Sequence, residues 1–159
     1  MRVVVSFSGL ALERNLRNAI SMAVKKSILK VPSTVKNKWV KGKTKLCVSV
    51  FLVGNRKSQK LNKAYRKKNR PTDVLSFSRL EAIAFPGKDL EIGDLVICLP
   101  VAKKQAKLYG LSLKEELQRL TVHGTLHLFS YDHERSLAEE KKMFRLQDKI
   151  LQSIWKLDP

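Results

Sequence analysis

Residues 112–133 read SLKEELQRLTVHGTLHLFSYDH, and this stretch combines a helix start, an apolar stripe and every histidine of the chain. Ser112 and Glu115 form the pattern of a capping box, in which each side chain satisfies a backbone N–H in the first helical turn. Apolar residues and a glycine then recur at helical spacing: Leu113, Leu117, Leu120, Gly124 and Leu128. The stretch therefore predicts an amphipathic helix that buries this stripe.

The three histidines, His123, His127 and His133, form the pattern of a metal site. Positions i and i+4 share one face of a helix, so His123 and His127 can direct their imidazoles to one point. His133 lies beyond the helix end, where a turn can return its side chain to that point. Three imidazoles suit zinc and leave a fourth coordination position for water, as in catalytic sites. Nickel, iron or copper could also use these ligands, so zinc is the default expectation.

The net charge of +18 is confined to the first part of the chain. Residues 1–72 contain 19 Lys and Arg and a single acid, Glu13, whereas residues 73–159 contain 13 basic and 13 acidic residues. Such an excess attracts polyanions through counterion release, which favours a nucleic-acid partner. A solvated basic surface and attraction to acidic membranes are the alternatives, but no basic amphipathic anchor with exposed aromatic residues is apparent.

Length and composition indicate one domain with its own core, since the 159 residues are 43% hydrophobic. No apolar run reaches the roughly 18 residues of a membrane span, and the first residues become polar too soon for a signal peptide. Cys47 and Cys98 lie in apolar, strand-like contexts and form no CxxC pair, which favours reduced, buried thiols. We therefore expect a cytoplasmic protein, most simply in a bacterium.

Hydrophobic periodicity and turn residues predict an alternation of strands and helices before residue 112. We expect strands at 2–8, 46–53, 74–77 and 92–99, helices at 16–31, 56–68 and 101–109, and a Lys-rich loop up to Thr44. In the helix at 56–68, Leu61 and Tyr65 are expected to face inward. A final helix begins after Ser136 and runs to about Lys156, with an inward face of Met143, Ile150 and Ile154.

The histidine spacing also matches the metzincin metalloproteases, whose motif is HExxHxxGxxH. Gly124 stands where those enzymes carry the catalytic glutamate. It cannot act as a general base, which typically contributes about 10²- to 10⁴-fold to the rate. Peptide hydrolysis is therefore disfavoured.

The segment from His123 to His133 resembles the hallmark HGxLHLxGYDH of the YbeY endoribonucleases, a family of ribosomal RNA maturation factors. The similarity covers about residues 46–155 and includes LNKAYR at 61–66, RPTDVLSF at 70–77, GDLVIC at 93–98 and Met143 downstream. Residues 1–45 are similar to the family only in their strand–helix pattern. Ser130 replaces a glycine of the family. If that position is left-handed, we expect strain of about 1 kcal/mol and a lower metal affinity.

The resemblance implies an α+β fold with a four-stranded mixed sheet, about five helices and a metal-binding helix packed beside the sheet. Residues 1–159 would form a single zinc-hydrolase domain. The implied activity is zinc-dependent, single-strand-specific RNA cleavage, acting in 3′-end maturation of small-subunit ribosomal RNA and in ribosome quality control. The implied partners are single-stranded RNA, ribosomal RNA and the ribosome or its small subunit, without a membrane.

The same resemblance assigns roles to four residues. His123, His127 and His133 would bind one zinc ion per chain, and Arg66 would be catalytic. A guanidinium can pair with phosphate through two hydrogen bonds and stabilise charge in the transition state. Charge alone does not distinguish Arg66 from its basic neighbours, so its assignment rests on the motif.

Several points stay open at the level of sequence. The nucleophile could be an activated water or the 2′-hydroxyl of the RNA, no general base is evident, and Asp132 could orient a ligand or cap a turn. A non-catalytic RNA-binding assembly factor of the ribosome with a structural zinc is the main alternative, and a protease-like zinc hydrolase is a weaker one. Four protein ligands would close the metal site, whereas three would leave it open. The oligomeric state is undetermined.

Overall fold

The structure, a computed structural model, describes residues 1–81 and 86–156, which contain four strands and six helices. The expected α+β class is confirmed, with one helix more than the five expected. The elements are β1 (Arg2–Gly9), α1 (Arg14–Lys30), α2 (Ser33–Val40), β2 (Lys45–Val53), α3 (Asn55–Arg66), β3 (Val74–Ser78), β4 (Asp89–Cys98), α4 (Leu99–Tyr109), α5 (Leu113–Leu128) and α6 (Leu137–Trp155).

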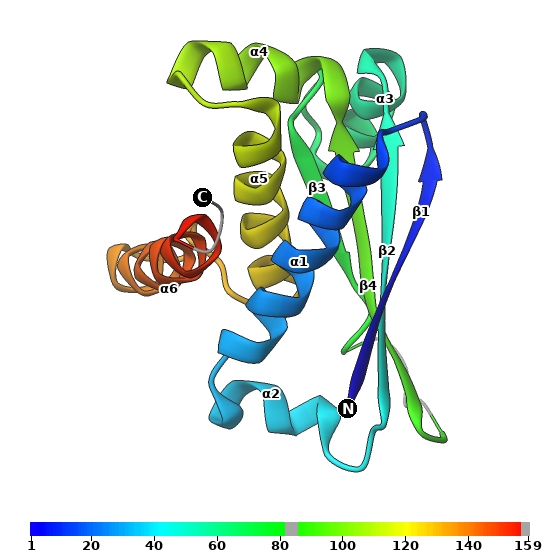
Figure 1. Cartoon of the computed structure of the whole chain (residues 1–159), viewed down its shortest axis with the longest axis vertical. Coiled ribbons are helices and arrows are strands. Elements are labelled where there is room, and N and C mark those ends of the chain that lie inside the picture. The colour runs from blue at the N-terminus through cyan, green and yellow to red at the C-terminus, as the bar shows by residue number, and fades with distance from the viewer. Residues whose placement is uncertain (82–85, 157–159) are drawn as a thin grey trace.

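The four strands form one mixed sheet in the order β1-β2-β4-β3. β1, β2 and β4 are parallel, and β3 pairs with β4 in the antiparallel sense. β2 is a central strand, as its apolar sequence predicts, and its residues Leu46, Val48, Val50 and Leu52 are buried. The helices α1 and α5 cover one face of the sheet (Figure 1).

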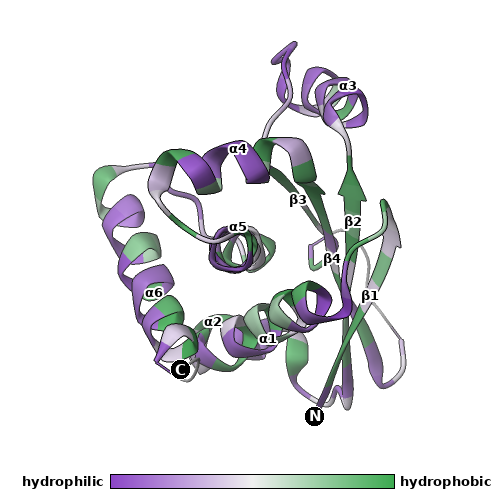
Figure 2. Ribbon diagram, turned by 45° about the horizontal axis from the view of Figure 1, so that its top comes forward, coloured by the Kyte–Doolittle hydropathy of each residue, from purple (hydrophilic) through white to green (hydrophobic). Residues whose placement is uncertain are grey.

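α5 lies at the centre of the helical layer, enclosed by the sheet, α1, α4 and α6 (Figure 2). The predicted capping box is present: the Ser112 hydroxyl accepts from the Glu115 N–H at 3.2 Å, and the Ser112 N–H donates to the Glu115 carboxylate at 2.8 Å. The predicted stripe is buried at Leu117, Leu120, Gly124 and Leu128, and Leu113 packs half-buried against the same core.

Gly124 allows α5 to approach β3 and β4 closely. A Cβ at this position would lie 2.9 Å from Leu95 Cδ2 and 3.0 Å from Ser76 Oγ. The Ser76 hydroxyl donates to the Gly124 carbonyl at 3.0 Å, and the Ser78 hydroxyl donates to the Leu128 carbonyl at 2.8 Å. Close packing and these two hydrogen bonds offset the cost of glycine inside a helix, about 1 kcal/mol relative to alanine.

The segment before Thr44 differs from the expected loop, because residues 33–40 form the helix α2. Val40 is 8% exposed and Trp39 packs against the core, its ring 6.3 Å from that of Phe129. A longer run of apolar spacing would have revealed a helix, but this one has only eight residues. The apolar spacing was too short to outweigh the surrounding lysines, so the sequence predicted a loop for this segment.

α3 also differs from the expectation in its end and in its inward face. It ends at Arg66 because Lys67 adopts a left-handed conformation with φ 61°. Leu61 is half-buried, whereas Tyr65 is 66% exposed, so the prediction that Tyr65 faces inward was wrong. The buried positions are Ser58 and Asn62.

Polar side chains face inward on α3 because they hold the loop that follows. The Ser58 hydroxyl donates to the Thr72 carbonyl at 2.8 Å and accepts from the Thr72 N–H at 2.9 Å. The Asn62 amide donates to the Arg70 carbonyl at 2.8 Å. A search for apolar periodicity cannot detect a helix face of this kind.

Cys47 and Cys98 are both free, as expected. Cys98 is buried, whereas Cys47 is partly exposed, so the prediction of a buried thiol was wrong for Cys47. Within the described part of the chain, no helix has the length and apolar character required to cross a membrane.

Gly93 generates a prediction about stability. It follows a bulge in the pairing of β2 with β4, has φ 155°, and a Cβ there would clash with the carbonyl oxygen of Phe77. We expect Gly93→Ala to lower the free energy of unfolding by about 3 kcal/mol, because backbone must move to relieve the clash. Urea denaturation measures this change.

Gly42→Ala is the matched control, since Gly42 has φ 79° but a Cβ added there would have no neighbouring atom within 4 Å. It should cost only the left-handed strain of about 1 kcal/mol. Equal losses for the two variants would contradict the proposed clash.

Candidate metal centre

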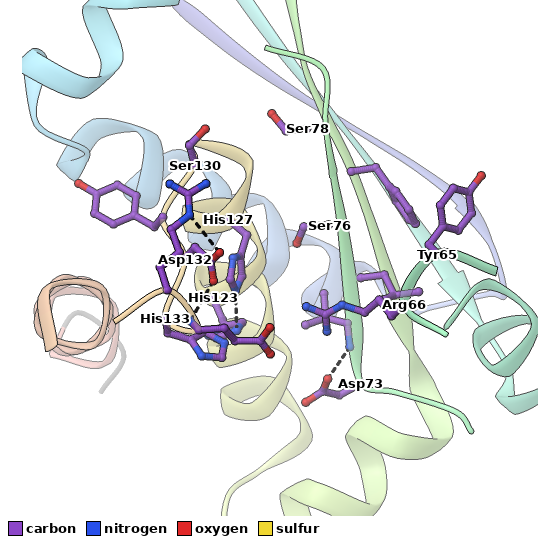
Figure 3. A pocket seen from close by; sticks show the side chains of 16 residues that line it. Tyr65, Arg66, Asp73, Ser76, Ser78, His123, His127, Ser130, Asp132 and His133 are labelled. Atoms are coloured by element: carbon purple, nitrogen blue, oxygen red, sulfur yellow. Dashed lines mark hydrogen bonds and ion pairs between the residues drawn. The ribbon is translucent and has the colours of Figure 1, made fainter. Parts of the chain in front are cut away.

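The structure brings together all three histidines that the sequence singled out. His123 and His127 project from successive turns of α5, and His133 arrives from the turn that follows (Figure 3). One nitrogen from each ring lies within 4.8 Å of the others. The Nε2 atoms of His123 and His127 are 3.1 Å apart. Two ligand nitrogens of a tetrahedral zinc ion would lie about 3.3 Å apart, given Zn–N bonds of about 2.0–2.1 Å.

The second ring nitrogens of two histidines have partners. His123 Nδ1 lies 2.9 Å from Gln147 Oε1 and donates to it, because an amide oxygen only accepts. His127 makes a hydrogen bond to the backbone of Tyr131. Because His123 donates from Nδ1, its Nε2 carries a lone pair, and this atom lies 3.1 Å from Nε2 of His127, an arrangement that a bound cation would stabilise.

Burial favours the neutral form of His123 and His127. It lowers the pKa of His127 to about 4, and the charges of His123 and His133 lower this pKa further. Burial also lowers the pKa of His123, although the hydrogen bond to Gln147 opposes the shift. Neutral imidazole is the form that binds metal, so near pH 7 no proton has to leave either ring.

The C-terminal turn of α5 positions His133. The Tyr131 N–H donates to the Leu126 carbonyl at 3.2 Å and the Ser130 N–H donates to the His127 carbonyl at 3.0 Å, the two bonds of a Schellman motif. Ser130 occupies the left-handed position of this motif with φ 64°, where glycine is usual. The strain expected if Ser130 is left-handed is therefore present, partly offset by a hydrogen bond from its hydroxyl to Glu81 at 3.1 Å.

Asp132 caps this turn. Its carboxylate accepts from the Glu134 N–H at 2.9 Å and pairs with Arg135 Nε at 3.2 Å. The hydrogen bond from the Glu134 backbone, followed by the charge of Arg135, lowers the pKa of Asp132. Of the two roles left open by the sequence, the structure supports the cap.

Gln147 is the residue of this centre that sequence reasoning missed. It is 6% exposed on α6, within an otherwise apolar inward stripe that includes Met143, Ile150 and Ile154. One polar side chain at helical spacing within such a stripe was the available signal, because buried polar groups need partners.

A cavity of about 690 Å³ opens beside the histidines. α5 and its following turn form one wall, and the other is formed by β3 and the end of α3 (Figure 3). Arg66 is exposed in this cavity and extends toward the histidines. Within residues 1–81 and 86–156, its guanidinium makes no ion pair. It is thus free to bind an anion.

The formal charge of the cavity wall indicates that an anionic ligand would need a cation. Two arginines, Arg66 and Arg135, face three carboxylates, Asp73, Asp132 and Glu134. Apart from the histidines, the carboxylates therefore outnumber the arginines by one charge, and a divalent ion would reverse the sign of this excess. A phosphodiester would therefore enter more favourably once a metal is bound.

The residues present fit an open metal centre. Over the described residues, the group of side chains able to hold an ion comprises three histidines and no fourth ligand. Three protein ligands would leave a coordination position of a bound ion open, whereas a structural zinc site is closed by four protein ligands.

Comparisons with known proteins find similarity over most of the chain. The model of the family Endoribonuclease YbeY matches residues 12–155, so the similarity extends well before residue 46. An endoribonuclease YbeY from Sulfurihydrogenibium sp. is 48% identical over 107 residues, which are 67% of this chain and 69% of that protein. The Aquifex aeolicus protein of the same name is 45% identical over 109 residues, and the match covers 69% of this chain and 71% of the Aquifex protein. The solution structure of a Thermotoga maritima protein is also similar, with a TM-score of 0.62 and 25% sequence identity. The match covers 96% of this chain and 90% of the Thermotoga chain.

The contact between His123 and Gln147 predicts a metal-affinity effect. We expect Gln147→Leu to weaken zinc binding by about 10- to 100-fold, because the imidazole loses the partner that fixes its tautomer and orientation. Titration calorimetry with zinc measures the change. Gln152→Leu, at an exposed position on the same helix, is the control and should bind zinc like the wild type. Equal affinity of Gln147→Leu and wild type would exclude a role for this contact.

The left-handed conformation of Ser130 predicts a stabilising substitution. Ser130→Gly should raise the free energy of unfolding by up to about 1 kcal/mol by removing the strain, and zinc affinity should rise with it. Ser130→Ala retains the strain and loses the hydrogen bond to Glu81, so it should not stabilise. Thermal unfolding of both variants separates these effects, and a gain for alanine equal to that for glycine would argue against backbone strain.

Proposed function

Because this chain belongs to the YbeY family of endoribonucleases, hydrolases that cleave RNA phosphodiester bonds in ribosomal RNA processing, we propose that it is a zinc-dependent enzyme acting on single-stranded RNA. The observation that carries the proposal is that His123, His127, His133 and Arg66 line one cavity. The three histidines are the proposed ligands of one zinc ion per chain, and Arg66 is the proposed catalytic residue.

The protein side of the mechanism is positioning and charge stabilisation. A bound zinc ion would act as a Lewis acid toward a phosphoryl oxygen or a water molecule. Arg66 would bind the non-bridging phosphate oxygens through two N–H groups and stabilise the charge that develops on them. Gln147 and the turn after α5 would keep the histidines in one orientation. Two carboxylates of the cavity wall, Asp73 and Asp132, are held by protein donors: Asp73 accepts from the Val74 N–H at 2.7 Å and from Gln105 at 3.1 Å.

Two alternatives are less well supported. A structural zinc in a non-catalytic assembly factor would use four protein ligands, whereas three histidines are found in the part of the chain that the structure describes. A metzincin-like protease would need a carboxylate at position 124. That position packs against Leu95, Ser76 and Val74 instead of facing the histidines.

The wider role that we propose is maturation of the 3′ end of small-subunit ribosomal RNA and ribosome quality control in the cytoplasm, with the ribosome or its small subunit as partner. Residues 1–159 would act as one catalytic domain. The basic excess of residues 1–72 supports an RNA partner, since 19 basic residues stand against one acid there.

Cleavage of a labelled single-stranded fragment of ribosomal RNA by the zinc-loaded protein tests the proposal. His123→Ala and Arg66→Ala should each lower kcat/KM by about 10²- to 10³-fold, because each removes stabilisation of charge in the transition state. Arg70→Ala is the control for charge alone, since Arg70 does not line the cavity.

Circular dichroism and a filter-binding assay accompany these measurements. Folded variants that retain RNA binding but lose cleavage would support the enzyme. Equal cleavage by all variants would indicate a contaminating nuclease, and RNA binding without cleavage by the zinc-loaded wild type would favour the assembly factor.

A further inference from the structure

Tyr65 is an aromatic side chain exposed to the candidate active-site cavity. It directly precedes Arg66 on α3, lines the same cavity and is 66% exposed. In Figure 3, Arg66 lies between Tyr65 and His123. An apolar ring at this place contributes little to the core, whereas a ligand that binds at Arg66 would reach it.

Tyr65 contacts a second aromatic residue of the cavity wall, Phe77 of β3. The two ring centroids are 4.9 Å apart and the planes make an angle of 69°, an edge-to-face arrangement. Such a contact covers at most one face of the tyrosine ring. The other face is available for stacking with a planar ligand.

The two rings are held by rigid elements. Phe77 pairs with Asp94 in the sheet. Tyr65 lies in the last turn of α3, whose inward residues Ser58 and Asn62 fasten the following loop. A platform fixed in this way loses little side-chain freedom when a ligand stacks on it.

The surroundings of Tyr65 favour a polyanionic ligand. α3 and the loop up to Thr72 contain eight basic residues and no acidic residue. α3 stands at the end of the sheet, and most of its residues are hydrophilic (Figure 2). Aromatic platforms beside basic surfaces are the way in which proteins bind single-stranded nucleic acid.

We propose that Tyr65, supported by Phe77, forms a nucleobase-stacking subsite that holds an unpaired base next to the phosphate bound by Arg66. The inference rests on the proposed function, because Arg66 and the histidines define where the phosphodiester lies. A base in a duplex is stacked on its neighbours and cannot offer its face to Tyr65. The subsite therefore supplies a physical reason for a preference for single strands.

Fluorescence of 2-aminopurine tests the stacking without requiring cleavage. The probe is a single-stranded 2′-O-methyl RNA that contains one 2-aminopurine, with the base placed at successive positions in a set of oligonucleotides. One position should lose fluorescence on binding to the zinc-loaded wild type. Tyr65→Ala should abolish this quenching and weaken binding about 10- to 100-fold, whereas Tyr65→Phe should retain both, because stacking needs the ring and not the hydroxyl.

Tyr109→Ala is the matched control, since Tyr109 is a 55% exposed tyrosine at the end of α4 and does not line the cavity. It should bind and quench like the wild type. Wild-type quenching and affinity in a folded Tyr65→Ala protein with normal zinc content would overturn the proposal. Equal losses for the phenylalanine and alanine variants would also overturn it, since they would assign the effect to the hydroxyl.

Cleavage kinetics separate this inference from the proposed function. On single-stranded RNA, Tyr65→Ala should raise KM more than it lowers kcat, and the ratio of single-strand to duplex cleavage should fall. A wild type that binds and quenches the base but does not cleave would refute the proposed function and leave the subsite standing. A Tyr65→Ala protein with wild-type KM and strand preference would refute the subsite alone.

Discussion

The close contact of α5 with β3 is the constraint on which the candidate site depends. Gly124 lets the helix approach the sheet, and the hydroxyls of Ser76 and Ser78 donate to two of its carbonyl groups. These contacts fix the rotation of α5, because one side of the helix must face the strand. His123 and His127 lie beside that buried stripe, so the same packing directs their rings into the cavity.

The second wall of the cavity is held by polar contacts instead of apolar packing. Ser58 and Asn62 bind the backbone of the loop after α3, and the left-handed Lys67 ends the helix directly after Arg66. The backbone positions of Tyr65 and Arg66, from which their side chains extend into the cavity, are therefore fixed. A cationic group and an aromatic face on one wall, opposite three imidazoles on the other, form an arrangement suited to a phosphodiester with an unpaired base.

Local patterns predicted much of this arrangement. The capping box at Ser112, the stripe on α5 and the histidine spacing are effects of helix geometry over a few residues, and all are present in the structure. The sequence-based predictions were wrong where polar side chains form the buried face of a helix, as in α3, or where a helix is short, as in α2. Tyr65 was expected to face inward because an apolar ring was assumed to seek the core, whereas Ser58 and Asn62 occupy that face.

The sequence by itself determined the order of the strands and of every helix except α2, the central strand, the three histidines as a group and the basic character of the first 72 residues. These properties depend on composition and on spacing along one chain. Tertiary structure alone decided that Gln147 of α6 binds His123, that Arg66 of α3 shares a cavity with α5, and that Tyr65 faces that cavity. Each of these contacts joins segments that are distant in sequence. Whether such segments meet depends on how the helices pack on the sheet, which no local sequence pattern encodes.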